Sequence, residues 1–267
     1  MKAGFLQFKP EFGQPAKNSG KVRSLLKDRI FDLIVLPELA NSGYLFSDKS
    51  ELEHCSENPF TGEFTGCLKE ICAEKNCHIV SGLCERDGDL FYNSSVLVYP
   101  DGRIKVYRKI HLFDSEKKWF APGNMELEVH EISGKDYRNV KTGMMICFDW
   151  IFPETARTLA LKGAQIICHP SNLVMQYCQK AMFARALENH VFTITANRIG
   201  KESNGGDELT FTGESVILNP KGEYLFKGSA GKEEYAVTDI DPDEALNKFV
   251  RPSNNLFDDR RSEFYKL

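Results

Sequence analysis

Features that are scarce or missing in this 267-residue sequence exclude several classes of protein. No apolar run approaches the roughly 18 residues of a membrane-spanning helix, and the first ten residues lack the apolar segment of a secretory signal. With 11 prolines and 20 glycines, the chain is not a fibrous or low-complexity protein. Its net charge of −4 predicts no basic surface for nucleic acid or an anionic membrane. We therefore expect a globular, cytoplasmic protein that binds neither.

Short motifs of nucleotide-binding and hydrolytic enzymes are also missing. The sequence contains no GxxxxGKS/T loop, no GxGxxG, no GxSxG and no HExxH, which argues against a nucleotide-binding protein, a serine hydrolase and a zinc protease. Several of the eight cysteines gather between Cys67 and Cys84, but without the CxxC pair of a zinc site. We expect reduced thiols that pack as small buried side chains, and neither a metal nor a cofactor.

Short apolar runs alternate with helical stretches along the whole chain. A continuous run such as Leu33–Leu36, ended by Pro37, is typical of a strand buried on both faces. Strands are predicted over Ala3–Phe8, Leu33–Leu36, His78–Cys84, Leu90–Tyr99, Arg103–Lys109, Val140–Phe148, Gln165–Cys168, Val191–Ala196, Leu209–Leu218 and Tyr235–Ile240. Helices are predicted over Asn18–Ile30, Phe64–Lys75, Pro153–Leu161 and Gln176–Glu188.

This alternation predicts an α/β protein with some hairpins. The sequence has no internal repeat, no linker and no change in composition, so we expect a single domain over residues 1–267. The last segment, 249–267, is polar and charged with a few aromatic residues. It is either a surface tail or an arm that contacts a partner subunit.

Three residues could carry chemistry, although each also has an ordinary structural explanation. Glu38 ends a fully apolar strand, where a carboxylate is either a surface cap or a partly buried group with a raised pKa. Lys109 is the last residue of the strand predicted over Arg103–Lys109, where charge usually marks a solvated face. Cys147 lies where an apolar strand passes into a helix, so its sulfur could be presented near helix N–H groups that favour a thiolate.

Together the three types of side chain are sufficient for one reaction. Attack of a thiol on an amide or nitrile carbon needs a nucleophile, a base that returns the proton to the departing nitrogen, and a positive group for the developing oxyanion. Cysteine, glutamate and lysine can supply these functions without histidine or metal. The three stand in the blocks LPELANSGY, YRKIHLF and GMMICFDWIFPE.

These blocks, in this order and spacing, resemble the nitrilase superfamily of carbon–nitrogen hydrolases. The similarity extends through GAQIICHPSNLV, RALENHVFTITANRIG and DDRRSEFYKL, and so covers nearly the whole chain. The resemblance implies a four-layer αββα sandwich that pairs into homodimers or larger homo-oligomers through helices and the C-terminal arm. It also implies a small-molecule amide or nitrile as substrate.

The resemblance further assigns roles to particular residues. It makes Cys147 the nucleophile and Glu38 the general base and acid. It makes Lys109 and the backbone N–H of Phe148 the groups that hold the tetrahedral oxyanion. A thioester on Cys147 would then be hydrolysed by a water that Glu38 activates.

A second glutamate follows the lysine in this family. Glu116, seven residues after Lys109, is the best match, and its expected role is to fix the lysine and the substrate nitrogen. The same stretch contains Asp114, so the fourth acid of the site is either Glu116 or Asp114.

The residues after the cysteine give expectations about the substrate. Family members that bind a substrate carboxylate often have arginine three or four residues after the nucleophile, where this chain has Trp150 and Ile151. We therefore expect a neutral or cationic amide, a carbamoyl amine or a small nitrile. Trp150 either lines the substrate pocket or packs in the core, and Asn172 either bonds the substrate or caps a loop. Arg185 and Glu188 are predicted to pair with each other.

Several functions remain open at this point. An amidase is favoured over a nitrilase, although both use the same three residues. A cysteine peptidase would need His111, His169 or His190 as the partner of Cys147, and none of these stands in a peptidase motif. A binding or scaffold protein without activity is a third possibility. The presence of a suitable side chain at all three catalytic positions argues against it.

Overall fold

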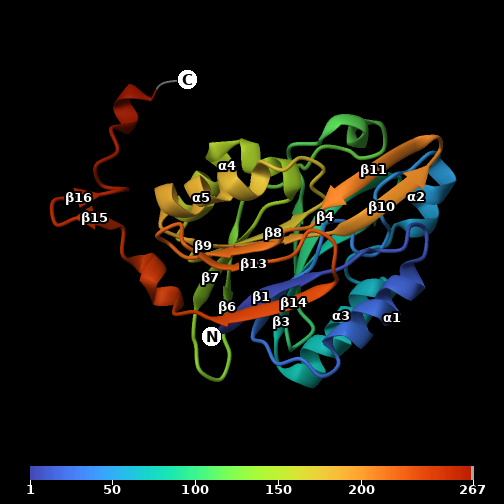
Figure 1. Ribbon diagram of the computed structural model, residues 1–267, viewed down its shortest axis with the longest axis horizontal. Helices are drawn as coiled ribbons and strands as arrows, with labels where there is room; N and C mark the ends of the chain where they lie inside the picture. Colours follow the sequence, from blue (N-terminus) through green and yellow to red (C-terminus); the bar gives the residue numbers. More distant parts are fainter. Residues whose placement is uncertain (266–267) are drawn as a thin grey trace.

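The structure, a computed structural model, describes residues 1–265 as two six-stranded sheets packed face to face (Figure 1). The first sheet has the order β14 (Glu234–Asp239), β1 (Lys2–Gln7), β2 (Leu33–Val35), β3 (His78–Asp87), β4 (Leu90–Val98) and β5 (Ile104–Arg108). The second has the order β13 (Tyr224–Lys227), β12 (Val216–Leu218), β9 (Phe192–Asn197), β8 (Ile166–Ser171), β7 (Val140–Met144) and β6 (Val129–Ile132).

Helices cover the outer face of each sheet, as Figure 1 shows. The long helices α1 (Pro15–Leu26) and α3 (Glu63–Lys75) pack on the first sheet, with the short α2 (Lys49–Cys55) beyond its far end. The second sheet carries α4 (Pro153–Leu161) and α5 (Cys178–Asn189). Pro15 and Pro153 each start a helix, where the missing N–H has no cost.

The largest apolar core lies between the two sheets and under α4 and α5. It includes the inward side chains of the first sheet, such as Phe5 and Val35, and of the second, such as Ile167 and Ile194. A separate cluster fills the space between the first sheet and its helices, where Ile34 and Leu68 are fully buried. The predicted αββα sandwich is therefore confirmed, and the central strands are apolar because helices and sheet cover both faces.

The strand predicted over Leu209–Leu218 is wrong. The chain instead forms a hairpin outside both large sheets, from β10 (Ile199–Asn204) and β11 (Asp207–Thr212), and then turns into β12. Gly213 and Glu214 both have positive φ, +60° and +52°, so the backbone cannot continue as one strand. The hairpin contacts the loop that follows β2, because Glu202 on β10 accepts hydrogen bonds from the backbone of that loop.

Other predicted boundaries also differ from the structure. The strand predicted over Val140–Phe148 ends at Met144, and a 3₁₀ helix begins at Cys147. The first helix ends at Leu26, and Ile30, which the helical spacing had included, is 76% exposed. The elements α2, β6, β10 and β13, and the two short strands of the C-terminal segment, were not predicted. Within residues 1–265 no helix is long and apolar enough to cross a membrane.

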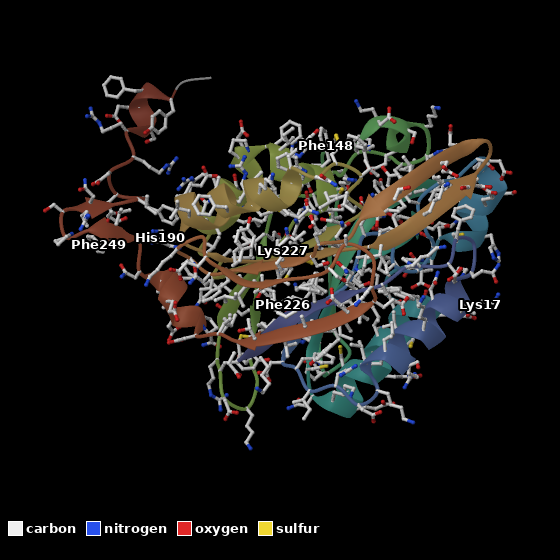
Figure 2. The ribbon with its side chains drawn as sticks, viewed as in Figure 1. Lys17, Phe148, His190, Phe226, Lys227 and Phe249 are labelled. Carbon is white, nitrogen blue, oxygen red and sulfur yellow. The ribbon has the colours of Figure 1, made fainter. Side chains whose placement is uncertain are left out.

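The C-terminal segment leaves the body of the protein (Figures 1 and 2). It forms the small hairpin β15 (Phe249–Arg251) and β16 (Asn254–Asn255), followed by the 3₁₀ turn Ser262–Phe264. Lys248 anchors its start, because the ammonium donates to the carbonyls of Asn189 and His190 at the end of α5, at 3.0 and 2.8 Å. Residues 266–267 of the predicted arm lie outside the described part of the chain.

Candidate active site

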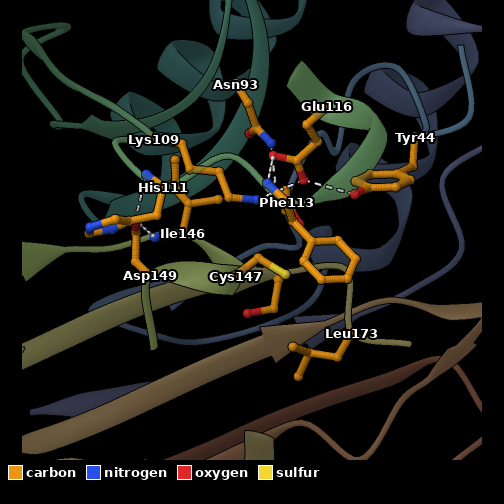
Figure 3. Close-up of polar contacts among 12 residues, drawn as sticks. Tyr44, Asn93, Lys109, His111, Phe113, Glu116, Ile146, Cys147, Asp149 and Leu173 are labelled. Atoms are coloured by element: carbon orange, nitrogen blue, oxygen red, sulfur yellow. Dashed lines mark hydrogen bonds and ion pairs between the residues drawn. The ribbon is translucent and has the colours of Figure 1, made fainter. Parts of the chain in front are cut away.

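Three charged side chains, Glu38, Lys109 and Glu116, meet in a buried cluster just after the ends of β2 and β5, and Figure 3 shows Lys109 and Glu116 of this cluster. The ammonium of Lys109 donates to Oε1 of Glu38 and to Oε1 of Glu116, both at 2.7 Å. All three side chains are at most 2% exposed. The amide of Asn93, from β4, donates to the same Glu38 oxygen at 2.7 Å. An ammonium has three N–H donors, so one remains for another acceptor.

Glu38 is held in place by the strand that precedes it and by a close neighbour on β3. The carbonyl of Pro37 accepts from the N–H of Gly82 at 3.0 Å, which continues the pairing between β2 and β3. A Cβ at position 82 would lie 2.4 Å from Cα of Glu38, so only glycine allows this approach. Leu39, directly after the glutamate, has φ +48°, a conformation that a leucine rarely adopts. Glu38 thus sits on a tightly fixed bend.

Cys147 lies on a second fixed bend, with φ +38°. Asp149 closes this bend, because its Oδ2 accepts from the N–H of Ile146 at 2.8 Å and from the hydroxyl of Tyr107 at 2.7 Å. On the other side, Nε2 of His169 lies 2.9 Å from the Cys147 carbonyl. Burial lowers the pKa of His169 to about 4, so the ring is neutral at physiological pH. The strained backbone is therefore held at both ends.

The sulfur of Cys147 lies beside the charged cluster, as Figure 3 shows. Burial, followed by the nearby carboxylate of Glu38, raises the pKa of the thiol well above its usual value, although the Lys109 ammonium opposes this effect. For Lys109, burial alone would lower the pKa of the ammonium, but the carboxylates of Glu116 and Glu38 raise it. The resting arrangement is therefore a neutral thiol beside a permanent cation, and the thiol needs a base before it can attack.

The structure brings Glu116, and not Asp114, to the lysine. Glu116 is 2% exposed, whereas Asp114 lies at the surface. The hydroxyl of Tyr44 donates to Glu116 Oε1 at 2.8 Å. Burial raises the pKa of Glu116, with Glu38 adding to this, while Lys109 and the Tyr44 hydroxyl lower it. Tyr44 and Lys109 therefore share one oxygen of the same carboxylate.

A pocket opens onto the cysteine. It is lined by Phe113, Cys147, Phe148, Trp150, Asn172, Leu173, Val174, Met175, Tyr177 and Cys178. None of these lining residues carries a full charge. Both polar atoms of the Asn172 side chain are buried and have no hydrogen-bond partner among the described residues. The three predicted substrate-binding residues, Phe148, Trp150 and Asn172, thus line one pocket.

The two residues predicted to pair on α5 do so. Arg185 Nη1 lies 2.6 Å from Oε1 of Glu188, and its Nε also donates to the carbonyl of Trp150 at 3.0 Å. Through this second bond the arginine fixes the backbone of Trp150, which lines the pocket.

The histidines offered for a cysteine peptidase have other contacts. His169 bonds the main-chain carbonyl of Cys147, and its other ring nitrogen bonds Thr195. His111 bonds Asp149 at 2.8 Å and stacks on a phenylalanine ring. His190 bonds a carbonyl at the start of the C-terminal segment. These contacts argue against a thiol–histidine pair, and the charged groups that act on the thiol are Glu38, Lys109 and Glu116.

Sequence reasoning did not identify Tyr44, Asn93 or Asp149 as parts of the site. Tyr44 stands in the LPELANSGY block and Asp149 in the GMMICFDWIFPE block, but no role was predicted for either residue. The signal for Asn93 was the polar group Asn93–Ser95 inside an otherwise apolar strand, which is fully buried in the structure.

Comparison with known proteins agrees with this geometry. The sequence model of the carbon–nitrogen hydrolase family matches residues 3–246. A nitrilase from Pyrococcus abyssi is 44% identical over 99% of each chain, and an (R)-stereoselective amidase from a Pseudomonas species is 35% identical over 86% of this chain and 80% of its own. A carbon–nitrogen hydrolase structure from Helicobacter pylori G27 matches with a TM-score of 0.86 and 29% identity, over 99% of this chain and 96% of its own. The chain therefore belongs to the carbon–nitrogen hydrolase family and is an enzyme of that class.

Proposed function

We propose that this enzyme hydrolyses small neutral amides through a thioester on Cys147. The observation that carries the proposal is the shared Lys109 ammonium, which lies 2.7 Å from each of two buried carboxylates beside the cysteine. Oε2 of Glu38 is buried and has no hydrogen-bond partner among the described residues, while its Oε1 is fixed by two donors. One oxygen thus positions the carboxylate and the other is free to accept a proton.

The first half of the reaction forms the thioester. Glu38 takes the thiol proton at Oε2 as the sulfur attacks the carbonyl carbon. The third N–H of Lys109 and the N–H of Phe148, in the first turn of its 3₁₀ helix, stabilise the oxyanion. The tetrahedral adduct then collapses, the C–N bond breaks, and Glu38 returns its proton to the leaving nitrogen.

The second half regenerates the thiol. Glu38 takes a proton from a water molecule that attacks the thioester carbonyl, and the same donors hold the second oxyanion. Collapse of this adduct breaks the C–S bond, releases the acid and returns the proton to the sulfur. Glu116 keeps Lys109 in position throughout. Its Oε1, 2.7 Å from the lysine Nζ, prevents the ammonium from shifting toward Glu38.

The pocket favours an uncharged acyl group. Its lining residues are mostly apolar and include no lysine, arginine, aspartate or glutamate, so a substrate carboxylate or ammonium would be buried without a partner. The unpaired side-chain amide of Asn172 offers two N–H donors and one acceptor oxygen to a polar group of the substrate. We therefore place neutral amides before carbamoyl amines and before monoamides of dicarboxylic acids.

Nitrile hydrolysis is the second candidate, and the relative from Pyrococcus abyssi that bears the name nitrilase favours it. The same cysteine, glutamate and lysine could add the thiol to a nitrile carbon. A nitrile then needs two water molecules and releases ammonia from a later adduct, so the two functions differ in substrate and not in the site.

Ammonia release from four matched compounds tests the proposal. Butanamide, butyronitrile, succinamate and 4-aminobutanamide share a short aliphatic chain and differ in the reacting group or in charge. We expect butanamide to have the highest kcat/KM, and succinamate to be lower by about 100-fold or more, because its carboxylate lacks a partner in the pocket. Preference for succinamate would contradict the proposed pocket, and preference for butyronitrile would favour the second candidate. A Cys147→Ala variant should be inactive, whereas Cys67→Ser, at a half-buried cysteine on α3, should retain activity.

We also propose that the enzyme forms a homodimer or larger assembly in the cytoplasm. Within the described residues, the C-terminal segment 249–265 extends from the body and exposes apolar side chains, including Phe249 and Phe264, at 52% and 69%. Phe183 and Leu187 on α5 are also exposed, at 43% and 39%. All eight cysteines are free thiols, which suits a reducing compartment.

A further inference from the structure

A second buried cation lies near the site and has no role in the reaction described above. Arg198, between β9 and β10, is fully buried. Its Nη2 pairs with Oε2 of Glu202 on β10 at 2.8 Å. A fully buried arginine is rare unless its charge is compensated, so the contacts of this pair require an explanation.

The carboxylate of Glu202 binds the loop that carries Tyr44. Its Oε1 accepts from the backbone N–H groups of Tyr44 and Leu45, both at 2.7 Å. Gly43, with φ +83°, allows this approach, because a Cβ there would lie 2.9 Å from Oε2 of Glu202. Tyr44 and Glu202 are 158 residues apart in the chain, so these bonds connect the β10–β11 hairpin to the loop after β2.

The same arginine also acts on the ring of Tyr44 through Phe211. The guanidinium of Arg198 lies 4.0 Å from the centre of the Phe211 ring. The Tyr44 ring meets Phe211 edge to face, with the ring centres 6.0 Å apart. Phe211 therefore separates Arg198 from Tyr44 and contacts both, so the backbone and the ring of Tyr44 are each held by groups that Arg198 organises.

We propose that Arg198 and Glu202 are positioning residues for the reaction, which act through Tyr44 on Glu116. The ion pair and Phe211 fix Tyr44 so that its hydroxyl donates to Glu116 Oε1, 2.8 Å away. Glu116 in turn holds the Lys109 ammonium at 2.7 Å. The inference rests on the proposed function, because it assumes that Lys109 stabilises the oxyanion.

A merely structural role for the pair makes a different prediction. If Arg198 and Glu202 only stabilise the hairpin, their loss should lower stability, and its effect on kcat should not depend on the Tyr44 hydroxyl. If they act through that hydroxyl, their loss should matter little once the hydroxyl is gone. Substrate affinity should change little in either case, since none of these residues lines the pocket.

The test is a double-mutant cycle on the full-length enzyme, with butanamide as the substrate and kcat and KM measured separately. The single variants are Glu202→Gln, which keeps an acceptor oxygen but removes the charge, and Tyr44→Phe. We expect each single variant to lower kcat about tenfold with KM changed less than about twofold, and the double variant to lower kcat about tenfold and not about a hundredfold. Glu208→Gln removes the exposed pair with Lys201 on the same hairpin and should leave kcat unchanged.

Independent effects that multiply to about a hundredfold in the double variant would overturn the inference. An unchanged kcat in Glu202→Gln would do the same. If Glu202→Gln does not fold, Phe211→Leu replaces it in the cycle, because it removes the ring between Arg198 and Tyr44 without leaving a charge unpaired. Failure of the proposed function is a separate result, in which the wild-type enzyme itself releases no ammonia from any of the four compounds.

Discussion

The hydroxyl of Tyr44 shows how a single residue can tune the site. It shares Glu116 Oε1 with Lys109, and it lowers the pKa of Glu116, which burial and Glu38 raise. A lysine partner in the catalytic cycle should be an ionised carboxylate, so activity should be present above the pKa of Glu116 and lost as the pH falls through it.

Tyr44→Phe should therefore move the acidic limb of the pH profile of kcat to higher pH. Without the hydroxyl the pKa of Glu116 rises further, and kcat near neutral pH should fall about tenfold, which matches the loss of one hydrogen bond to a charged group. A pH profile of kcat with butanamide measures both effects. Tyr99→Phe removes a hydroxyl that bonds only a carbonyl at a distant sheet edge and serves as the control. An acidic limb at the wild-type position would refute the proposed role of Tyr44.

At the scale of elements, close contact between β3 and the bend after β2 fixes Glu38. Gly82→Ala would place a methyl group 2.4 Å from both Cα of Glu38 and the nitrogen of Leu39, where backbone atoms cannot move aside easily. We expect this variant to lose about 1–3 kcal/mol of unfolding free energy and to have a reduced kcat. Urea unfolding and ammonia release check the two effects.

A matched glycine within a helix provides the control. At Gly66, in α3, an added Cβ would meet nothing within 4 Å, so Gly66→Ala should leave kcat unchanged and raise stability by up to about 1 kcal/mol. A Gly82→Ala enzyme as stable and active as the wild type would mean that this contact does not position the glutamate.

Elements with a strong local signal could be predicted from the sequence, and those that depend on neighbours could not. The continuous run Leu33–Leu36 and the helix that starts at Pro153 were found because burial on both faces and a proline start leave clear patterns. β13 was missed, because all four of its residues are exposed at the sheet edge and show no alternation. The bend at Gly213 was missed because φ cannot be inferred from a strand-like sequence.

The same limit applies to the site. Glu38, Lys109 and Cys147 were selected from their places along the predicted strands and from the reaction that the three side chains can perform together, and the family resemblance then supported the choice. The structure places them together. For Asn93 the sequence offered a polar group within an apolar strand but not its partner, and for Glu202 it offered no signal, because both contacts form only when β4 and the β10–β11 hairpin meet the loop after β2.

At the scale of the whole molecule, the proposed assembly can be tested through the C-terminal segment, which exposes Phe249 and Phe264. A chain that ends at Asn247 lacks Lys248, which anchors the segment to α5, as well as the arm itself. We expect the truncated chain to form a smaller assembly than the full chain in sedimentation velocity, because apolar contact drives association. Ile30→Ser, at a residue 76% exposed in a loop of the first sheet, should not change the assembly. Equal sedimentation of the full and truncated chains would exclude a role for the arm in assembly.

The central claim is that an acyl group passes through the sulfur of Cys147. The direct measurement is mass spectrometry of the enzyme quenched in acid during turnover of butanamide. The account predicts a mass increase equal to one butanoyl group, located on the peptide that contains Cys147 and absent in Cys147→Ala. An adduct on any of the other cysteines, or continued turnover by the alanine variant, would contradict it.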